Sequence, residues 1–266
     1  MAAMETVEHI AALQRDGRLL AGAARRAGLA AAVPSCPPWQ VRDLLRHTGY
    51  VHRWAAGYVA EQQTEYQADE PTESEVLSGG PPDAELIDWF CAGHAGLVRT
   101  LTAADPALAC WTFLPGPSPL ATWARRQAHE TAIHRVDAEL AAGEVTPFPV
   151  DFAADGIDEL LVAMFGRDEA RLTPEQLAGE HPVLQVVASD DRADPSAWLV
   201  ELTADGTLAA KVSRGQGPAD CTLAGPASGL YQLLWNRCDP AAAGVIAAGD
   251  AGVLRSWQSG MHVTWS

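Results

Sequence analysis

The segment from Leu120 to Ala142 constrains the fold most, because it contains neither Gly nor Pro and is strongly helical. Glu130 and His134 stand four positions apart in it. Helical rotation of about 100° per residue places them on one face, one turn apart, where they can bind the same ion. His129 diverges from His134 by about 140°. The segment therefore differs from the His-Glu-x-x-His motif of zinc proteases.

A Glu and a His one turn apart are common on helices that carry no chemistry, so a metal site needs a ligand from a second element. One candidate is His47, on a helix predicted over residues 40–65, where it shares a stripe with Leu44, Val51 and Trp54. A His on such a stripe is usually a hydrogen-bonded core residue. His94, on the apolar stripe of the next predicted helix, poses the same choice between core residue and ligand.

Apolar periodicity predicts four long helices in the first half of the chain, over residues 5–29, 40–65, 83–104 and 120–142. The acidic, Gly- and Pro-rich stretch 65–82 is expected to be an exposed loop around a short turn, and the Pro-rich stretch 111–119 a loop entering the fourth helix. Connections marked by Pro favour a helical bundle, an architecture that builds metal sites from facing helices.

The period changes beyond His181, where apolar residues alternate in short runs separated by Asp- and Gly-containing turns. Strands are expected near residues 183–188, 197–202, 208–212, 220–223 and 245–247, and helices near 226–237 and 253–257. The predicted class is α+β. An N-terminal four-helix bundle (1–148) is followed by a helical connector (149–180), with a short turn starting at 173, and by a C-terminal α+β domain (181–266) on an antiparallel sheet.

Composition excludes several classes of protein. A net charge of −16 opposes binding to a phosphate backbone, and the chain has no apolar run of 18 residues and no signal-like N-terminus. Its five Cys are scattered without a Cys-x-x-Cys pair, so neither a disulfide framework nor a thiolate zinc site is indicated. We expect a cytoplasmic protein, monomeric or homodimeric, that binds neither nucleic acid nor membranes.

Three pieces of the sequence together resemble the mycothiol-dependent maleylpyruvate isomerase-like proteins, whose N-terminal domain is a DinB-like metal-binding bundle. The pieces are Trp39-x-Val41-Arg42-Asp43-Leu44-Leu45-x-His47, His129-Glu130-x-x-x-His134-Arg135-x-Asp137-Ala138-Glu139, and Gly225-Pro226-Ala227-Ser228 followed by Leu233-Leu234-Trp235-x-Arg237. Their order and spacing extend over nearly the whole chain.

The resemblance implies a divalent metal, usually zinc, bound by His47, Glu130 and His134. Such a His₂Glu set leaves one coordination position open, as in catalytic zinc sites. His52 and His129 lie on other faces, and we expect them to be outside the ligand set or exposed. Asp137 is a candidate to orient a ligand imidazole, although pairing with an Arg on the helix surface is the simpler expectation.

Zinc promotes loss of a thiol proton. No Cys occupies a ligand position, so the sulfur is expected from an external thiol, which the resemblance identifies as mycothiol. The thiolate would add to an activated double bond of a small electrophile, giving cis-trans isomerisation or S-transfer. For an anionic substrate or cosubstrate, Arg237 is the first candidate cation, and Arg125 and Arg126 are further candidates; each could instead cap a helix or lie in solvent. Two other functions stay open, a metal hydrolase and a non-catalytic ligand-binding or regulatory protein.

Overall fold

The structure is a computed structural model that describes residues 4–67, 71–166, 180–190, 196–203 and 210–260. These residues form two compact units, one extending to Thr146 and one beginning at Pro147. Each unit has its own buried apolar residues. In the described part of the chain, no helix is long and apolar enough to cross a membrane.

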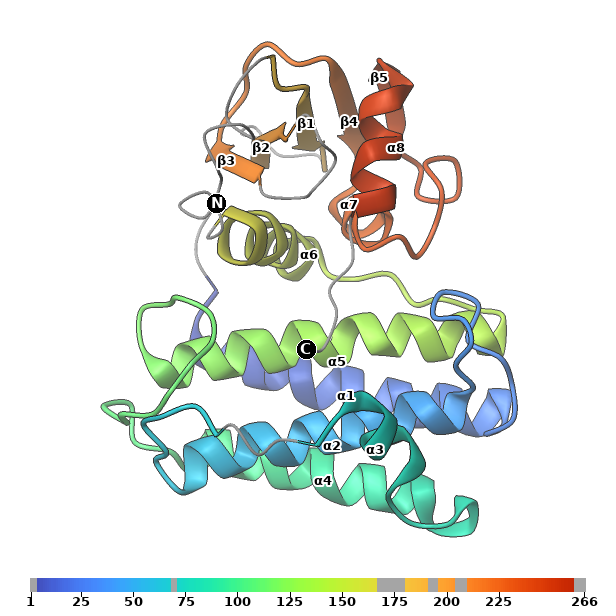
Figure 1. Ribbon diagram of the computed structural model, residues 1–266, viewed down its shortest axis with the longest axis vertical. Coiled ribbons are helices and arrows are strands. Elements are labelled where there is room, and N and C mark those ends of the chain that lie inside the picture. Colours follow the sequence, from blue (N-terminus) through green and yellow to red (C-terminus); the bar gives the residue numbers. More distant parts are fainter. Residues whose placement is uncertain (1–3, 68–70, 167–179, 191–195, 204–209, 261–266) are drawn as a thin grey trace. The chain divides into compact units, whose positions relative to one another are not determined.

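The first unit is a bundle of four long helices, which confirms the predicted architecture. They are α1 (Thr6–Ala27), α2 (Val41–Ala60), α4 (Asp83–Ala103) and α5 (Pro119–Ala142). Helix α1 packs mainly against α5, and α2 mainly against α4, while α1–α4 and α2–α5 contacts close the bundle. Figure 1 shows the four helices lying side by side.

Local sequence sets the ends of α5, the helix that carries two of the predicted ligands. The hydroxyl of Ser118 accepts a hydrogen bond from the backbone N–H of Ala121, and Pro119 occupies the first turn. At the other end Gly143 adopts φ 86°, and its N–H bonds to the carbonyls of Glu139 and Leu140. The left-handed conformation favours Gly because other residues have a Cβ that clashes there.

The acidic stretch that we predicted to be a loop contains a short helix, α3 (Glu73–Ser78). Thr72 and Glu75 form a capping box, in which each side chain accepts from the other residue's backbone N–H. This local pairing explains why an exposed acidic segment forms a helical turn.

The second unit contains a five-stranded sheet in the order β3-β2-β1-β4-β5. The strands are β1 (Val183–Ala188), β2 (Ser196–Leu202), β3 (Ala210–Arg214), β4 (Cys221–Gly225) and β5 (Ile246–Gly249). Helices α7 (Ala227–Leu234) and α8 (Ala251–Gly260) both pack on β1 and β4. The predicted α+β class is confirmed.

The predicted antiparallel arrangement of this sheet is wrong in one place, because β1 and β4 run parallel, with Leu184 opposite Cys221 and Val186 opposite Leu223. The connection 215–220 leaves β3 at one edge and enters β4 on the far side of β1. Apolar alternation identifies a strand but carries no information about its direction, so the mixed sheet could not be predicted from the pattern.

The first part of the predicted helical connector is α6 (Val150–Asp158), continued by a π-helical segment, η1 (Glu159–Phe165). Asp158, at the junction, accepts a bidentate ion pair from Arg214 of β3, with its Oδ1 and Oδ2 at 2.6 and 2.7 Å from Nε and Nη2. Trp198 of β2 donates to the same carboxylate. The predicted turn at 173–177 and the start of the predicted strand at 208–209 lie outside the described residues.

Candidate metal centre

Helices α2 and α5 bring three of the predicted ligands together. Nε2 of His47 lies 3.3 Å from Oε1 of Glu130, and Nε2 of His134 lies 3.1 Å from the same oxygen. One ligand atom from each side chain falls within 4.8 Å of the other two. Two imidazoles and one carboxylate from facing helices fit the His₂Glu donor set that zinc accepts.

Charges around the carboxylate keep Glu130 ionised. Burial by itself would raise its pKa, but the neighbouring His134, hydrogen bonds from both imidazoles and the Arg126 guanidinium hold the pKa well below its ordinary value. Arg126 is buried and donates from Nη2 to Oε2 of Glu130 at 3.0 Å. One carboxylate oxygen therefore faces the imidazoles and the other faces the guanidinium.

The same charges act on His134 in the opposite sense. Burial would lower its pKa, but the Glu130 charge and hydrogen bonds to Asp137 and Glu130 outweigh burial and raise the pKa to about 9. Without an ion, the favoured occupant of this space is a proton on His134. A divalent cation that binds here would have to displace that proton.

Asp137 lies behind His134 in the bundle interior, and not on the helix surface where a pairing with an Arg was the simpler expectation. It is fully buried, and its Oδ2 accepts from Nδ1 of His134 at 2.8 Å. With Nδ1 engaged, Nε2 is the nitrogen directed at Glu130. Arg135, the neighbouring cation, instead pairs with Asp16 of α1 and Glu139 of α5. A carboxylate behind a ligand imidazole is the usual arrangement in zinc sites.

The remaining bundle histidines do not join this cluster. His52 is fully buried, and its Nε2 lies 2.8 Å from the hydroxyl of Thr131. His94 Nε2 donates to the carbonyl of Leu13, and its ring fills the space over Gly17 where any larger residue would clash. His94 is therefore a core residue, one of the two roles considered from sequence.

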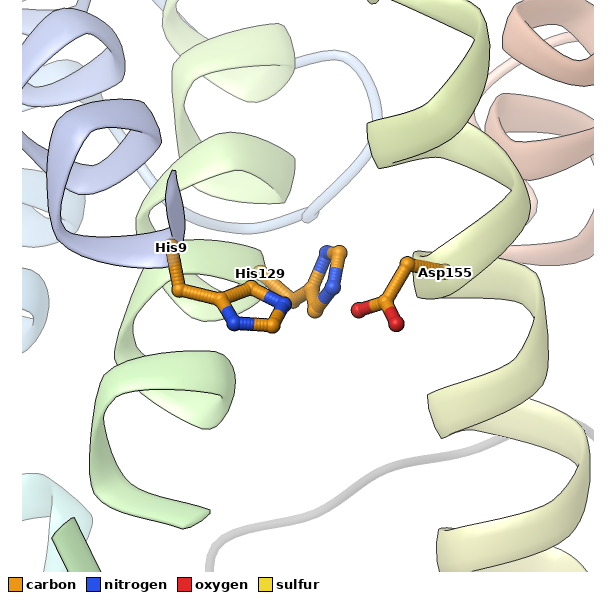
Figure 2. Close-up of side chains that lie close together, drawn as sticks. All are labelled: His9, His129 and Asp155. Carbon is orange, nitrogen blue, oxygen red and sulfur yellow. The ribbon is translucent and has the colours of Figure 1, made fainter. Parts of the chain in front are cut away.

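His129 packs its ring edge-on against His9 of α1, with the ring centroids 6.0 Å apart. Figure 2 shows these two side chains directed toward one another from α1 and α5, and it also labels Asp155 of α6, which belongs to the second unit. His129 points away from the face that carries Glu130 and His134, as the helical rotation predicts.

The predicted cations have different surroundings. Arg126 contacts Glu130 directly, whereas Arg125 is half-buried on the same helix. Arg237, in the second unit, donates from Nη1 to the carbonyl of Trp235 at 2.7 Å, with its guanidinium 6.0 Å from the centre of the Trp235 ring. This contact satisfies a carbonyl at the end of α7. A substrate-binding role for Arg237 and Arg125 stays a prediction.

Sequence reasoning missed one part of the centre, the loop that precedes α2. Trp39 lies against the imidazoles of His47 and His134, and Ser35 and Cys36 donate to Asp137. Trp39 is part of the first family motif, but the motif assigns it no role. No local signal connects it to a residue on α5.

Comparisons with known proteins agree with this architecture. The family model of the mycothiol maleylpyruvate isomerase N-terminal domain matches residues 10–139, and that of the MDMPI C-terminal domain matches residues 151–256. A search of the curated proteins finds no match.

Two solved structures of similar fold are crystal structures of the mycothiol-dependent maleylpyruvate isomerase, one of them of a mutant. They are 14% identical to this chain, with TM-scores of 0.62 and 0.60, and the alignments cover 94% of this chain and 98% of the other. The resemblance seen in the motifs is confirmed. Because the two domain models match most of both units, the chain belongs to the mycothiol-dependent maleylpyruvate isomerase family.

Proposed function

We propose that this protein is a mycothiol- and divalent-metal-dependent enzyme that isomerises, or transfers a thiol to, a small electrophile carrying an activated carbon-carbon double bond. The convergence of His47, Glu130 and His134 on one point carries the proposal. The family match supplies the thiol, since the related solved structures are described as mycothiol-dependent.

A zinc ion bound by these three side chains would stabilise a thiolate at neutral pH. Glu130 supplies the negative charge that attracts the cation, and Asp137 fixes the His134 ring so that Nε2 is available. Arg126, bonded to the outer oxygen of Glu130, keeps that carboxylate in one orientation. Arg126 is also a buried cation beside Glu130, and it could stabilise negative charge that develops on a substrate at this site.

The chemistry balances without a redox partner. The thiolate sulfur adds to one carbon of the double bond, and the π electrons move onto the conjugated carbonyl oxygen as an enolate. The former double bond is now a carbon-carbon single bond, so rotation about it is possible. Expulsion of the thiolate then restores the double bond and gives the trans isomer. Protonation of the adduct instead gives an S-transfer product. The choice between these outcomes depends on the substrate.

The test begins with zinc content and turnover of maleylpyruvate with and without mycothiol. Wild-type protein is expected to bind about one zinc per chain and to require the thiol. His47→Ala should lose both the metal and the activity, whereas His181→Ala, which changes a His of the second unit, should keep both. Thiol-independent hydrolysis by zinc-loaded protein would instead support the hydrolase alternative. Stoichiometric metal without turnover of any conjugated electrophile would favour a binding protein.

A further inference from the structure

We propose that residues 33–40, here called the covering loop, are a working part of the metal centre. In this role, which rests on the proposed function, Trp39 holds the two ligand imidazoles in position and shields the bound cation from water. Trp39 is thus assigned as a positioning residue that sets metal affinity.

The indole of Trp39 lies against both ligand rings. Its centroid is 5.1 Å from that of His47 with an interplanar angle of 49°, and 6.3 Å from that of His134 with an angle of 28°. The two imidazoles meet edge to face at 4.9 Å. They come from α2 and α5, so a single side chain contacts the ligands of both helices.

The backbone of the covering loop holds the indole in this place. The N–H of Trp39 donates to the carbonyl of Cys36 at 2.8 Å, and its own carbonyl accepts from Val33 at 2.9 Å. Ala32 and Gln40 form an antiparallel bridge at the base of the loop. Trp39 is half-buried and packs on the apolar cluster that includes Leu44 and Leu45. Its ring has little freedom to leave the imidazoles.

The covering loop reaches the centre at a second point, behind His134. The hydroxyl of Ser35 donates to Oδ1 of Asp137 at 2.5 Å, and the thiol of Cys36 lies 3.6 Å from Oδ2. Asp137 in turn accepts from His134. The covering loop therefore contacts both ligand rings through Trp39, and through Ser35 and Cys36 it contacts the carboxylate that orients His134. Packing of the loop against the bundle would not by itself require both sets of contacts.

Two physical effects connect this arrangement to metal affinity. An imidazole that binds a cation becomes more positive, and the negative face of an indole stabilises positive charge. An apolar ring also lowers the local dielectric, which strengthens the attraction between Glu130 and the ion. Rings already held in position lose less entropy when the ion binds.

The experiment compares Trp39→Leu, Trp39→Phe and Trp89→Leu in the full-length protein. Trp89 is a matched control, because it is also half-buried and packs on the same apolar cluster, but its ring lies over Arg53. Zinc affinity is measured by competition with a chromophoric chelator, and metal-free thermal unfolding is recorded for each variant. Zinc-dependent tryptophan emission is the additional readout.

Trp39→Leu is expected to bind zinc about 10- to 100-fold more weakly, the usual effect of losing a group that supports a metal ligand. Trp89→Leu should bind within about twofold of wild type, and Trp39→Phe should fall between. A zinc-dependent emission change in wild type should disappear in Trp39→Phe. Equal zinc affinity in Trp39→Leu and Trp89→Leu, with wild type binding tightly, overturns this inference and leaves the proposed function intact.

Two further outcomes are informative. Wild-type protein that binds no zinc overturns both proposals. If Trp39→Leu does not fold, the decision rests on Trp39→Phe and on Ser35→Ala, which removes only the hydroxyl bonded to Asp137. The inference is supported if Ser35→Ala binds zinc more weakly than wild type and Trp39→Phe loses the zinc-dependent emission change. It is overturned if Ser35→Ala binds zinc as tightly as wild type and Trp39→Phe keeps the emission change.

Discussion

At the scale of single residues, Asp137 connects two parts of the chain that are distant in sequence, helix α5 and the covering loop. Its carboxylate accepts from His134 on its own helix and from Ser35 and Cys36 in the covering loop. All of these donors surround one fully buried charge. Hydrogen bonds to an ionised acceptor in a low-dielectric interior are strong. Loss of the Asp137 charge should therefore change how well His134 binds a metal.

Asp137→Asn is expected to weaken zinc binding about 10- to 100-fold, because an amide makes His134 a poorer ligand than a carboxylate does. Competition titration against a chelator measures the change. Asp88→Asn is the control, since the Asp88 side chain is 91% exposed. An affinity equal to that of the control would show that Asp137 serves packing only.

The His134 pKa of about 9 predicts how the metal-free protein responds to pH. A pKa raised above the ordinary 6.5 adds stability that is complete below pH 6.5 and is lost as the pH rises through about 9. Glu130, with a lowered pKa, adds stability that is present above 4.5 and is lost as the pH falls. The contribution of Glu130 and His134 to the free energy of unfolding is therefore largest between pH 4.5 and pH 6.5.

Chelator-treated protein should lose on the order of 2 kcal/mol of unfolding free energy between pH 6 and pH 9.5 through this group. Urea unfolding at the two pH values measures the loss. His134→Gln has no titrating group at this position and should show a smaller loss. Identical pH profiles for the two proteins would contradict the assignment of the titration to His134.

At the scale of elements, α1 and α5 are held by a buried ion-pair network in addition to apolar packing. Arg135 is fully buried and contacts Asp16 at 3.1 Å and Glu139 at 2.7 Å. It also donates to the carbonyl of Thr146, whose N–H and hydroxyl donate to Glu139. Burial raises the pKa of Asp16, and the Arg135 charge opposes that rise.

Arg135→Ala should destabilise the bundle by about 3 to 5 kcal/mol, because it removes the buried cation from Glu139 and leaves Asp16 paired with the partly exposed Arg15. Chemical denaturation measures this, with Arg25→Ala as the control, since the Arg25 side chain is 54% exposed. A loss below about 1 kcal/mol would mean that water or a neighbouring group replaces the guanidinium.

At the scale of the whole molecule, the chain consists of two compact units that meet in sequence between Thr146 and Pro147. All three proposed ligands, Asp137 and the covering loop belong to the first unit. Thr146 is the last residue bonded into the Glu139 network. Every residue of the proposed metal centre therefore belongs to one unit.

A fragment of residues 1–146 is expected to fold cooperatively and to bind about one zinc, because it has its own apolar core and every proposed ligand. Circular dichroism melting and zinc titration of this fragment test the expectation. A fragment that folds but binds no zinc would mean that the second unit contributes to the ion site. The His47→Ala form of the fragment is the negative control.

The amino-acid sequence predicts the features that depend on local periodicity and turn chemistry. The four long helices, the shared face of Glu130 and His134 and the strands of the second unit follow from patterns within a few tens of residues. The family follows from three short motifs in a fixed order along the chain. Helical rotation relates residues one turn apart without reference to the rest of the chain.

Features that depend on contacts between distant segments could be identified only from the packed fold. His47 meets Glu130 across 83 positions, and Ser35 meets Asp137 across 102. The parallel pairing of β1 with β4 is also non-local. Periodicity shows that a face is buried but not what it is buried against. The roles of Asp137, His94 and Trp39 therefore emerged only once the helices and the covering loop were packed together.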